Sequence, residues 1–533
     1  MKLYPTGPTL HVAMAGTTMV ILGVVLKSTP MIGFGGAMII AVALGRALAE
    51  ATVNQLRRAG FEMIWRDKSG ARGMVTEVSR NHPCELFIEL RNRSDADVRG
   101  VTLRPLASPL LEVELSPQEI DLPAQASAEI RVVVRGRRVG RHGLHGLSIV
   151  ARGIPIGGDA LYEAPLMFAN PRGVVVLPTP TRALASSARG GRQRAGSVHS
   201  FTSQRRGEGD ELRELRDHVP GDPFKRIAWK ASARRGTLLV RDTEQETEDV
   251  IWVFLDASTD LASGRVGQAP LDLAIDGAAS IFASHLRRGR AGLYCYASRM
   301  LARVAPTRGP EALHAAEQAL LSCTLFADAD RSELDESEVL RRVLEHLRPL
   351  DPLSLGGVSP SDIEGVATRA DSLKQRAPFT LRLPEAPHLR EARLRHYLAA
   401  FGIESPPKNE DARPQSEFQL AVGLRSLLEK KQSPPGTVCI IAPVPRDTEL
   451  LLPVLRALRK ARVSVEWRPP PVVLPSTPGF SETVARALRT RADLEEKLGM
   501  RAIRRAGVTV RPLREIPEPL LESTLKEAHE RSA

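Results

Sequence analysis

Aromatic residues are scarce in this chain: Phe, Trp and Tyr together make up 4% of its 533 residues. Hydrophobic residues nevertheless reach 42%, so the folded parts must build their cores from aliphatic side chains. Cysteine is also rare, and the four cysteines lie far apart, with no CxxC pair. This spacing argues against a disulfide framework or a structural zinc site and is typical of reduced, buried thiols.

Motifs of the common enzyme classes are absent as well. The chain has no GxxxxGK[ST] phosphate loop, no HExxH zinc motif and no GxSxG nucleophile elbow. Its histidines are scattered, and none forms a catalytic pattern with a cysteine. We therefore expect a protein that is not an enzyme. Metal-dependent hydrolysis by Asp222, Asp256 and Asp260 is the enzymatic alternative.

Two uncharged apolar runs are present near the N-terminus, over residues 9–26 and 31–45. Each is close to the roughly 20 residues that cross a bilayer, so residues 1–50 are predicted to form a transmembrane helical hairpin. Six basic residues follow, against Lys27 alone in the turn: Arg46, Arg57, Arg58, Arg66, Lys68 and Arg72. The positive-inside rule then predicts the inner (cytoplasmic) membrane, with the body of the protein in the cytoplasm. A cleaved signal peptide would explain the first run only.

Short alternating runs follow, and they predict a β-sandwich over residues 51–178. Residues 74–78, 84–90, 111–115 and 128–134 alternate with period two between turn residues, as half-buried antiparallel strands do. Residues 179–209 are rich in Arg, Ser, Gly and Ala and predict a basic flexible linker. Such a linker either contacts anionic lipid headgroups or is a solvated tether.

Strand and helix patterns alternate over residues 248–515, which predicts an α/β domain with a mostly parallel sheet. The unbroken apolar run at 250–255 fits a central strand that is covered on both faces. A long insertion, 324–415, interrupts this domain. Loops of that length are functional or disordered, and we expect this one to carry partner specificity. Residues 516–533 form a charged tail that is expected to be helical.

The segment at 210–247 combines many basic residues with a Pro220-Gly221 turn signal. Ile227, Trp229 and two nearby alanines give it apolar side chains to bury, so it is interpreted as an ordered connection. A solvated charged loop is the alternative.

The order of residues in this segment resembles the signature of the bacterial domain-of-unknown-function fifty-eight family. The matching residues are Leu215, Arg216, Pro220, Gly221, Asp222, Arg226, Ile227, Trp229, Ala233 and Arg234. The resemblance implies a membrane-anchored body with a β-rich domain, this signature and a von Willebrand factor A-like domain. It also implies a partnership with MoxR-type AAA+ ATPases, which act in protein or complex assembly.

The strand at 250–255 ends in Asp256, Ser258 and Asp260, which resemble the von Willebrand A metal motif Asp-x-Ser-x-Ser with its last Ser replaced. The resemblance adds Thr307 as a further oxygen ligand for Mg²⁺, a cation that prefers oxygen donors. An aspartate expected after strand 436–442 is missing, because Ala442 and Pro443 stand there, so the predicted site is degenerate. In the alternative interpretation Asp256 and Ser258 only cap the following segment.

These features together predict a non-enzymatic, membrane-anchored adaptor or scaffold that binds partner proteins through its von Willebrand A-like domain. The net charge of +12 leaves a second hypothesis, a basic protein that binds nucleic acid or another anionic polymer. Base stacking needs aromatic side chains, and Phe224 and Trp229 stand nearly alone in the basic segment. Nucleic acid is therefore the less expected partner.

Overall fold

The computed structural model describes residues 3–58, 60–66, 74–95, 97–151, 161–179, 202–219, 224–246, 250–287, 289–323, 327–350, 361–409, 411–429, 435–471 and 482–513. The chain divides into two compact units. Unit 1 comprises Met1–Thr179, Arg265–Asp272 and Leu321–Glu410. Unit 2 comprises Pro180–Gly264, Leu273–Leu320 and Asp411–Ala533. The predicted helical tail, 516–533, lies outside the described residues.

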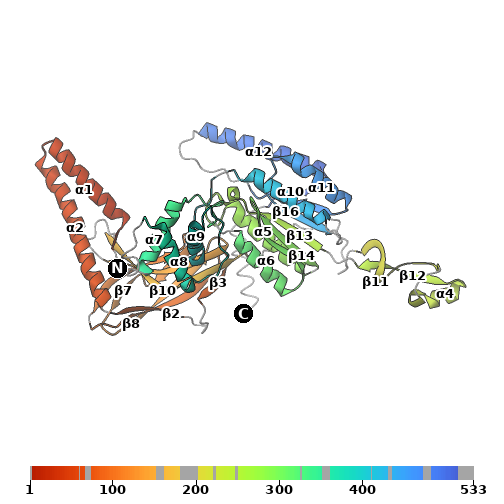
Figure 1. The fold of residues 1–533 in the computed structure, drawn as a ribbon, viewed down its shortest axis with the longest axis horizontal. Helices are drawn as coiled ribbons and strands as arrows, with labels where there is room; N and C mark the ends of the chain where they lie inside the picture. Colours follow the sequence, from red (N-terminus) through yellow and green to blue (C-terminus); the bar gives the residue numbers. More distant parts are fainter. Residues whose placement is uncertain are drawn as a thin grey trace. The chain divides into compact units, whose positions relative to one another are not determined.

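A helical hairpin follows the short strand β1 (Tyr4–Pro5) and consists of α1 (Gly7–Val25) and α2 (Thr29–Arg58) (Figure 1). The helices approach closely where two glycines meet, since a Cβ on Gly35 would lie 2.7 Å from the carbonyl oxygen of Gly16. Close packing through small residues is typical of membrane helices. Both helices are long and apolar enough to cross a bilayer, and most of their side chains are not covered by protein. The predicted pair of helices is confirmed, although α2 continues beyond the predicted end at residue 50.

Two sheets enclose the core of the β-domain in unit 1. The first sheet has the order β1-β10-β9-β5-β7, with β3 on β10, and the second has the order β2-β4-β8-β6. The strands are β2 (Phe61–Arg66), β3 (Val75–Ser79), β4 (Pro83–Asn92), β5 (Val98–Ala107), β6 (Leu111–Ser116), β7 (Glu119–Leu122), β8 (Ser127–Gly136), β9 (Gly140–Ala151) and β10 (Tyr162–Leu177). Aliphatic side chains from both sheets form one core, which confirms the predicted sandwich. The β3–β10 pair is parallel, unlike the antiparallel pairing expected throughout.

The predicted insertion is not a loop, and this corrects the expectation from its length. It folds into α7 (Glu336–Leu350), α8 (Ile363–Ser372), η3 (Leu373–Arg376) and α9 (Leu389–Phe401), which share a core of their own. Helices α7 and α9 contact β10 and β9 of the first sheet (Figure 1). The backbones meet closely where Gly143 faces the end of α9, because a Cβ on Gly143 would clash with the carbonyl oxygen of Phe401. Residues 327–409 therefore belong to the compact unit of the β-domain.

A buried histidine pair joins this helical subdomain to the sheet. His145 Nδ1 on β9 lies 3.1 Å from His346 Nε2 on α7, and His346 Nδ1 lies 2.8 Å from the Tyr397 hydroxyl on α9. Burial lowers the pKa of His145 to about 4 and that of His346 well below its usual value, the latter also because of the neighbouring His145. Both imidazoles are therefore neutral at pH 7.

Acid is expected to destabilise unit 1 through this pair. A histidine whose pKa is lowered by folding binds its proton more readily in the unfolded chain. Its contribution is therefore intact above pH 6.5 and is lost as the pH falls toward 4, by about 3 kcal/mol for His145. Urea unfolding between pH 4 and 7.5 should show a weaker pH dependence in His145→Gln than in the unmodified protein. His314→Gln removes an exposed histidine and serves as the control; equal slopes in all three proteins would contradict the prediction.

Unit 2 contains a six-stranded sheet of order β15-β14-β13-β16-β17-β18, parallel except for β15. Its strands are β13 (Val250–Asp256), β14 (Arg290–Tyr296), β15 (Met300–Thr307), β16 (Thr437–Ile441), β17 (Ser464–Trp467) and β18 (Thr509–Val510). Its helices are α5 (Pro270–Leu286), α6 (Pro310–Ser322), α10 (Arg413–Glu429), α11 (Thr448–Lys460) and α12 (Glu482–Arg505), with η2 (Thr259–Ala262) after β13. The first residues of α5, up to Asp272, belong to unit 1. Figure 1 shows α10, α11 and α12 on one face of the sheet and α5 and α6 on the other. The predicted mostly parallel α/β architecture is confirmed.

The signature segment folds into a small module, a strand hairpin with short helices between its strands. Strand β11 (Thr202–Asp217) pairs antiparallel with β12 (Leu239–Glu246), and η1 (Phe224–Arg226) and α4 (Trp229–Arg235) lie between them. Strand β11 begins inside the stretch that was predicted to be a linker. Ile227 and Ala228 are buried against β12, but Trp229 is 61% exposed, so the expectation that Trp229 is buried was wrong. The sequence does not show which of these three neighbouring apolar residues is exposed. Helix α4 begins at Trp229, and its start turns the Trp229 side chain outward.

Candidate functional site

The order of the sheet in unit 2 places a ligand site between β13 and β16. Numbered along the chain, the six strands follow the order 3-2-1-4-5-6. The strands that follow β13 are added toward one edge of the sheet, and those that follow β16 are added toward the other edge. In open α/β sheets the crevice for a ligand lies at this switch point, beyond the carboxyl ends of the strands. Asp256 is the last residue of β13, and Ala442 follows the last residue of β16.

Asp256 is a buried carboxylate, only 4% exposed. Its Oδ1 accepts a hydrogen bond of 2.9 Å from the backbone N–H of Ser258, and its Oδ2 lies 3.3 Å from the Ser416 hydroxyl on α10. Burial raises the pKa of Asp256 to about 6, and the hydrogen bonds from Ser258 and Ser416 offset only part of this effect. The charged form of Asp256 is thus poorly compensated within the chain.

Helix α10 supplies the second side of the site. It approaches the sheet closely at Gly423, where a Cβ would lie 2.9 Å from the rings of Phe254 and Tyr294. Glu417 accepts hydrogen bonds from the backbone N–H groups of Arg446 (2.8 Å) and Asp447 (3.1 Å), which fixes the loop after β16. The same loop leads into α11, whose first turn is capped by the Asp447 side chain. Ser416 and Glu417 are therefore held in place by structure on both sides.

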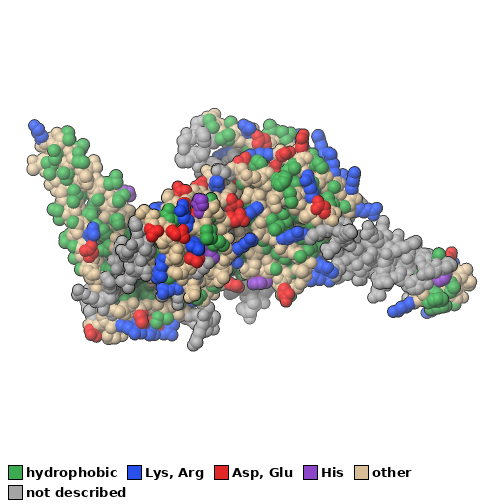
Figure 2. Space-filling view, in the orientation of Figure 1, with side chains coloured by type: hydrophobic (Ala, Val, Ile, Leu, Met, Phe, Trp, Pro, Cys, Tyr) green, Lys and Arg blue, Asp and Glu red, His purple; other side chains and the backbone are tan. Residues whose placement is uncertain are grey.

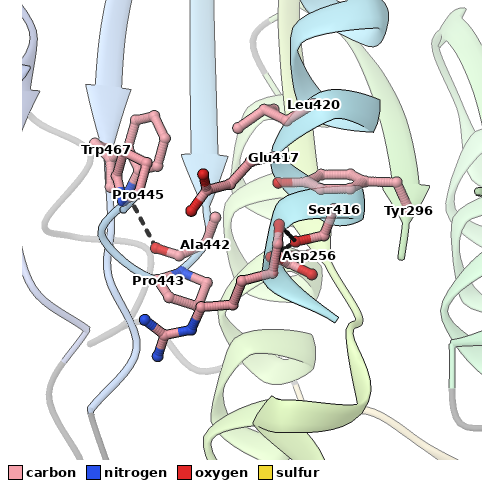
Figure 3. Close-up of a pocket in the computed structure, with 10 residues that line it drawn as sticks. Asp256, Tyr296, Ser416, Glu417, Leu420, Ala442, Pro443, Pro445 and Trp467 are labelled. Atoms are coloured by element: carbon pink, nitrogen blue, oxygen red, sulfur yellow. Dashed lines mark hydrogen bonds between the residues drawn. The ribbon is translucent and has the colours of Figure 1, made fainter. Parts of the chain in front are cut away.

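Tyr296, the last residue of β14, completes the site. Its side chain is fully buried, and its hydroxyl has no hydrogen-bond partner within the described part of the chain. Burial and the nearby charges of Asp256 and Glu417 raise the pKa of Tyr296 well above its usual value, so the hydroxyl stays protonated and available as a donor. Figure 3 shows this hydroxyl pointing into the space between Glu417, Ser416 and Asp256.

The cavity that these groups line is small, with about 10 Å³ of free volume. Its remaining walls come from Arg413, Leu420, Ala442, Pro443, Pro445 and Trp467. Trp467 is fixed because its indole N–H donates to the Ala442 carbonyl over 3.0 Å (Figure 3). A volume of this size holds about one water molecule or one ion. The enclosed space therefore fits a single small polar or cationic group.

The predicted metal ligands are not all brought together. Ser258 precedes η2, and its backbone N–H donates to Asp256, but its side chain makes no cap hydrogen bond. The capping interpretation therefore agrees with the structure for Asp256 and not for Ser258. Asp260 accepts a hydrogen bond from Ala412 N (3.2 Å) and lies 3.6 Å from the Arg413 guanidinium. Thr307 pairs with Ala291 at the amino end of β14, whereas Asp256 is level with Tyr296 at its carboxyl end. Five residues of strand span roughly 17 Å, so the assignment of Thr307 to this site was wrong.

A divalent cation fits this arrangement poorly. Among the described residues no group of three or more His, Cys, Asp or Glu side chains is placed to hold a metal ion. Mg²⁺ demands near-octahedral oxygen coordination, and Arg413 already brings a positive charge to the rim of the cavity. Magnesium binding at Asp256 stays a prediction that this geometry does not favour.

The signature residues lie elsewhere in unit 2. Arg216 is in β11, Arg226 in η1, and Arg234 in the last turn of α4, while Pro220, Gly221 and Asp222 lie outside the described residues. None of the described signature residues lines the cavity at Asp256. The sequence interpretation also missed Tyr296, Ser416 and Glu417. Tyr296 could have been found, because it ends the strand predicted beside Asp256; Ser416 and Glu417 are about 160 positions away and carry no local motif.

Fold and site together define a protein with a mostly parallel α/β sheet, an acidic site at the switch point of that sheet, a β-sandwich and two apolar N-terminal helices. Residues 214–347 match the family "Protein of unknown function DUF58", so the chain carries a domain of this family. The match runs from β11 to α7 and includes Asp256, but it ends before α10 and β16. The family suggested by the signature residues is thereby confirmed.

No curated protein matches the chain. Among solved structures, BatB from Bacteroides thetaiotaomicron is 10% identical with a TM-score of 0.23, covering 54% of this chain and 100% of that one. An aerotolerance-related membrane protein from Bacteroides fragilis is 10% identical with a TM-score of 0.21, covering 52% and 97%. A PapD-like domain of human CEP192 is 14% identical with a TM-score of 0.16, covering 22% and 86%. Likenesses at these scores carry no functional argument.

Proposed function

We propose that this protein is a membrane-anchored, non-enzymatic scaffold that binds a partner protein at the site around Asp256. The observation that carries the proposal is that two buried polar groups line the same cavity: the Asp256 carboxylate and the Tyr296 hydroxyl. The hydroxyl has no hydrogen-bond partner among the described residues. Buried polar groups are normally satisfied by protein groups, water, an ion or a ligand, so an exception needs an explanation. An ammonium would donate to the Asp256 carboxylate and to the oxygen of the Tyr296 hydroxyl, and its positive charge would compensate the carboxylate.

The size of the cavity favours binding over catalysis. Pockets for small-molecule substrates measure roughly 300–1,000 Å³, whereas this cavity offers about 10 Å³. A partner would therefore insert a single charged tip, such as a lysine ammonium. Such a contact resembles a hot spot of a protein interface, where a desolvated charged pair contributes strongly to affinity.

The N-terminal helices support the membrane part of the proposal. Their apolar side chains are largely uncovered in the structure, and a bilayer would cover them. We place the protein in the inner (cytoplasmic) membrane with its body in the cytoplasm, because basic residues lie in the C-terminal half of α2 and after it, and only Lys27 stands in the turn. Protease treatment of intact and lysed spheroplasts should degrade the body only after lysis; degradation in intact spheroplasts would reverse this orientation.

The family resemblance names the candidate partner, a MoxR-type AAA+ ATPase. The test is an affinity pull-down of the full-length, detergent-solubilised protein from its native cells, with Asp256→Asn in parallel and with Mg²⁺ or a chelator. We expect recovery of the ATPase to fall at least tenfold in the variant, because removing one member of a buried charged contact costs about 2–5 kcal/mol.

A matched control is Glu495→Gln, which removes an exposed carboxylate on α12. Recovery lost in Asp256→Asn but insensitive to chelation would identify a basic side chain of the partner as the ligand. Recovery lost on chelation as well would identify a shared metal ion. Equal recovery with all proteins would exclude the site around Asp256 as the contact, and failure to recover any ATPase would remove this partner from the proposal.

A further inference from the structure

The closed end of the β11–β12 hairpin exposes large apolar side chains. Phe224 is 74% exposed, Trp229 61% and Leu238 45%. They come from three consecutive parts of the module: η1, the start of α4, and the turn before β12. The module does not lack a core, because its interior is already filled by other apolar side chains: Ile227, Ala228, Leu239 and Val240.

Basic side chains surround this apolar end. Lys225, Lys230, Arg234 and Arg235 are all exposed, and none forms an ion pair with another described residue. Among the side chains described between positions 215 and 240, Asp217 is the single acidic one. Figure 2 shows hydrophobic and basic atoms gathered on the α4 module. The module therefore presents an apolar tip within a positively charged surface.

We propose that this tip, defined by Phe224, Trp229 and Leu238, docks into the headgroup region of an anionic lipid bilayer, with the four basic residues contacting lipid phosphates. The inference rests on the membrane anchorage proposed above. Trp partitions preferentially into the membrane interface, and basic residues near it are attracted to anionic lipids. A tether to the same bilayer raises the effective concentration of the tip at its surface, so a small contact suffices.

A lipid surface fits this arrangement better than a protein groove or a nucleic acid. The apolar residues lie at the end of a hairpin, and α4 has only seven residues, which is too short to offer a long helical face to a groove. Nucleic-acid binding through stacking uses rows of aromatic side chains in a basic groove, and here two aromatics lie beside a leucine at one tip. Charge and apolar character of the tip both complement a bilayer interface.

The test uses the full-length protein reconstituted in vesicles of phosphatidylcholine alone or of phosphatidylcholine and phosphatidylglycerol at 3:1, with brominated acyl chains as quencher. The difference in emission between the unmodified protein and Trp229→Phe isolates the signal of Trp229. We expect this signal to shift to the blue and to be quenched at least twofold in anionic vesicles. Lys230→Glu/Arg234→Glu should abolish the quenching, and high salt should weaken it.

The control variant Arg486→Glu/Arg491→Glu removes two exposed basic residues from α12 and should keep the quenching. Flotation of the same vesicles reports anchorage separately. Protein that floats without quenching of Trp229 would overturn the docking inference alone, and protein that does not float would overturn the anchorage. A blue shift that needs an added oligonucleotide or a soluble protein, but no anionic lipid, would also overturn the inference and assign the tip to that partner.

Discussion

Asp256→Asn is expected to stabilise unit 2 by about 3 kcal/mol at pH 8, even though it removes a buried, hydrogen-bonded residue. Burial raises the pKa of Asp256 to about 6, roughly two units above an ordinary aspartate, and each unit corresponds to about 1.4 kcal/mol. Ionising Asp256 at pH 8 therefore opposes folding. An asparagine can still accept the hydrogen bond from Ser258 N–H, and it carries no charge that needs compensation.

The sign of this effect fixes its pH dependence. A raised pKa means that the folded protein holds the Asp256 proton more tightly than the unfolded chain does. Its favourable contribution is complete below about pH 4 and is lost as the pH rises through 6. The stability difference between Asp256→Asn and the unmodified protein should therefore be small at pH 4 and reach its maximum above pH 7.

Urea unfolding of the detergent-solubilised full-length protein, followed by the emission of the buried Trp252 and Trp467, measures this difference. Asp447→Asn is the matched control, because Asp447 caps α11 from an exposed position, and asparagine caps helices as well as aspartate does. Its stability should change little at either pH. A variant at Asp256 that is less stable at pH 8 would show that the carboxylate is fully compensated and that its role is structural.

Breaking the buried ion pair between Arg138 and Asp272 is expected to have the largest destabilising effect, about 3–5 kcal/mol for Asp272→Ala. Arg138 Nε and a second guanidinium nitrogen lie 3.0 and 3.4 Å from the two carboxylate oxygens of Asp272. Both side chains are almost completely buried, at 5% and 1% exposure. The carboxylate also accepts the backbone N–H of Ala269 at 3.0 Å, so its removal takes a hydrogen-bond partner from both groups.

Calorimetric or urea unfolding of Asp272→Ala checks this prediction. Two further variants show whether the loss of stability comes from the buried charge. Arg138→Met/Asp272→Leu removes both charges and should recover most of the lost stability, because a buried guanidinium is costly once its carboxylate is removed. Glu482→Gln breaks an exposed pair with Arg486 on α12 and should change stability by less than about 1 kcal/mol. A loss for Asp272→Ala no larger than that of Glu482→Gln would contradict the prediction.

Local patterns in the sequence were sufficient for most of the secondary structure. The apolar run at 250–255 became β13, and Asp447 was placed correctly at the start of a helix, because both signals lie within a few residues. The length of the insertion at 324–415, by contrast, led to the wrong prediction of a loop. The helices between residues 336 and 401 bury their apolar side chains against each other, and they contact β9 and β10, which are far away in the sequence.

The sequence by itself determined the two apolar helices, the β-sandwich, the alternation of strand and helix, the signature of the family and the position of Asp256 at a strand end. These depend on periodicity, composition and short motifs. The tertiary structure alone decided that Tyr296, Ser416 and Glu417 surround Asp256, that Thr307 lies at the opposite end of the sheet, and that Trp229 faces outward. Strand order, strand direction and helix docking bring distant residues together or separate them, and no local pattern encodes these.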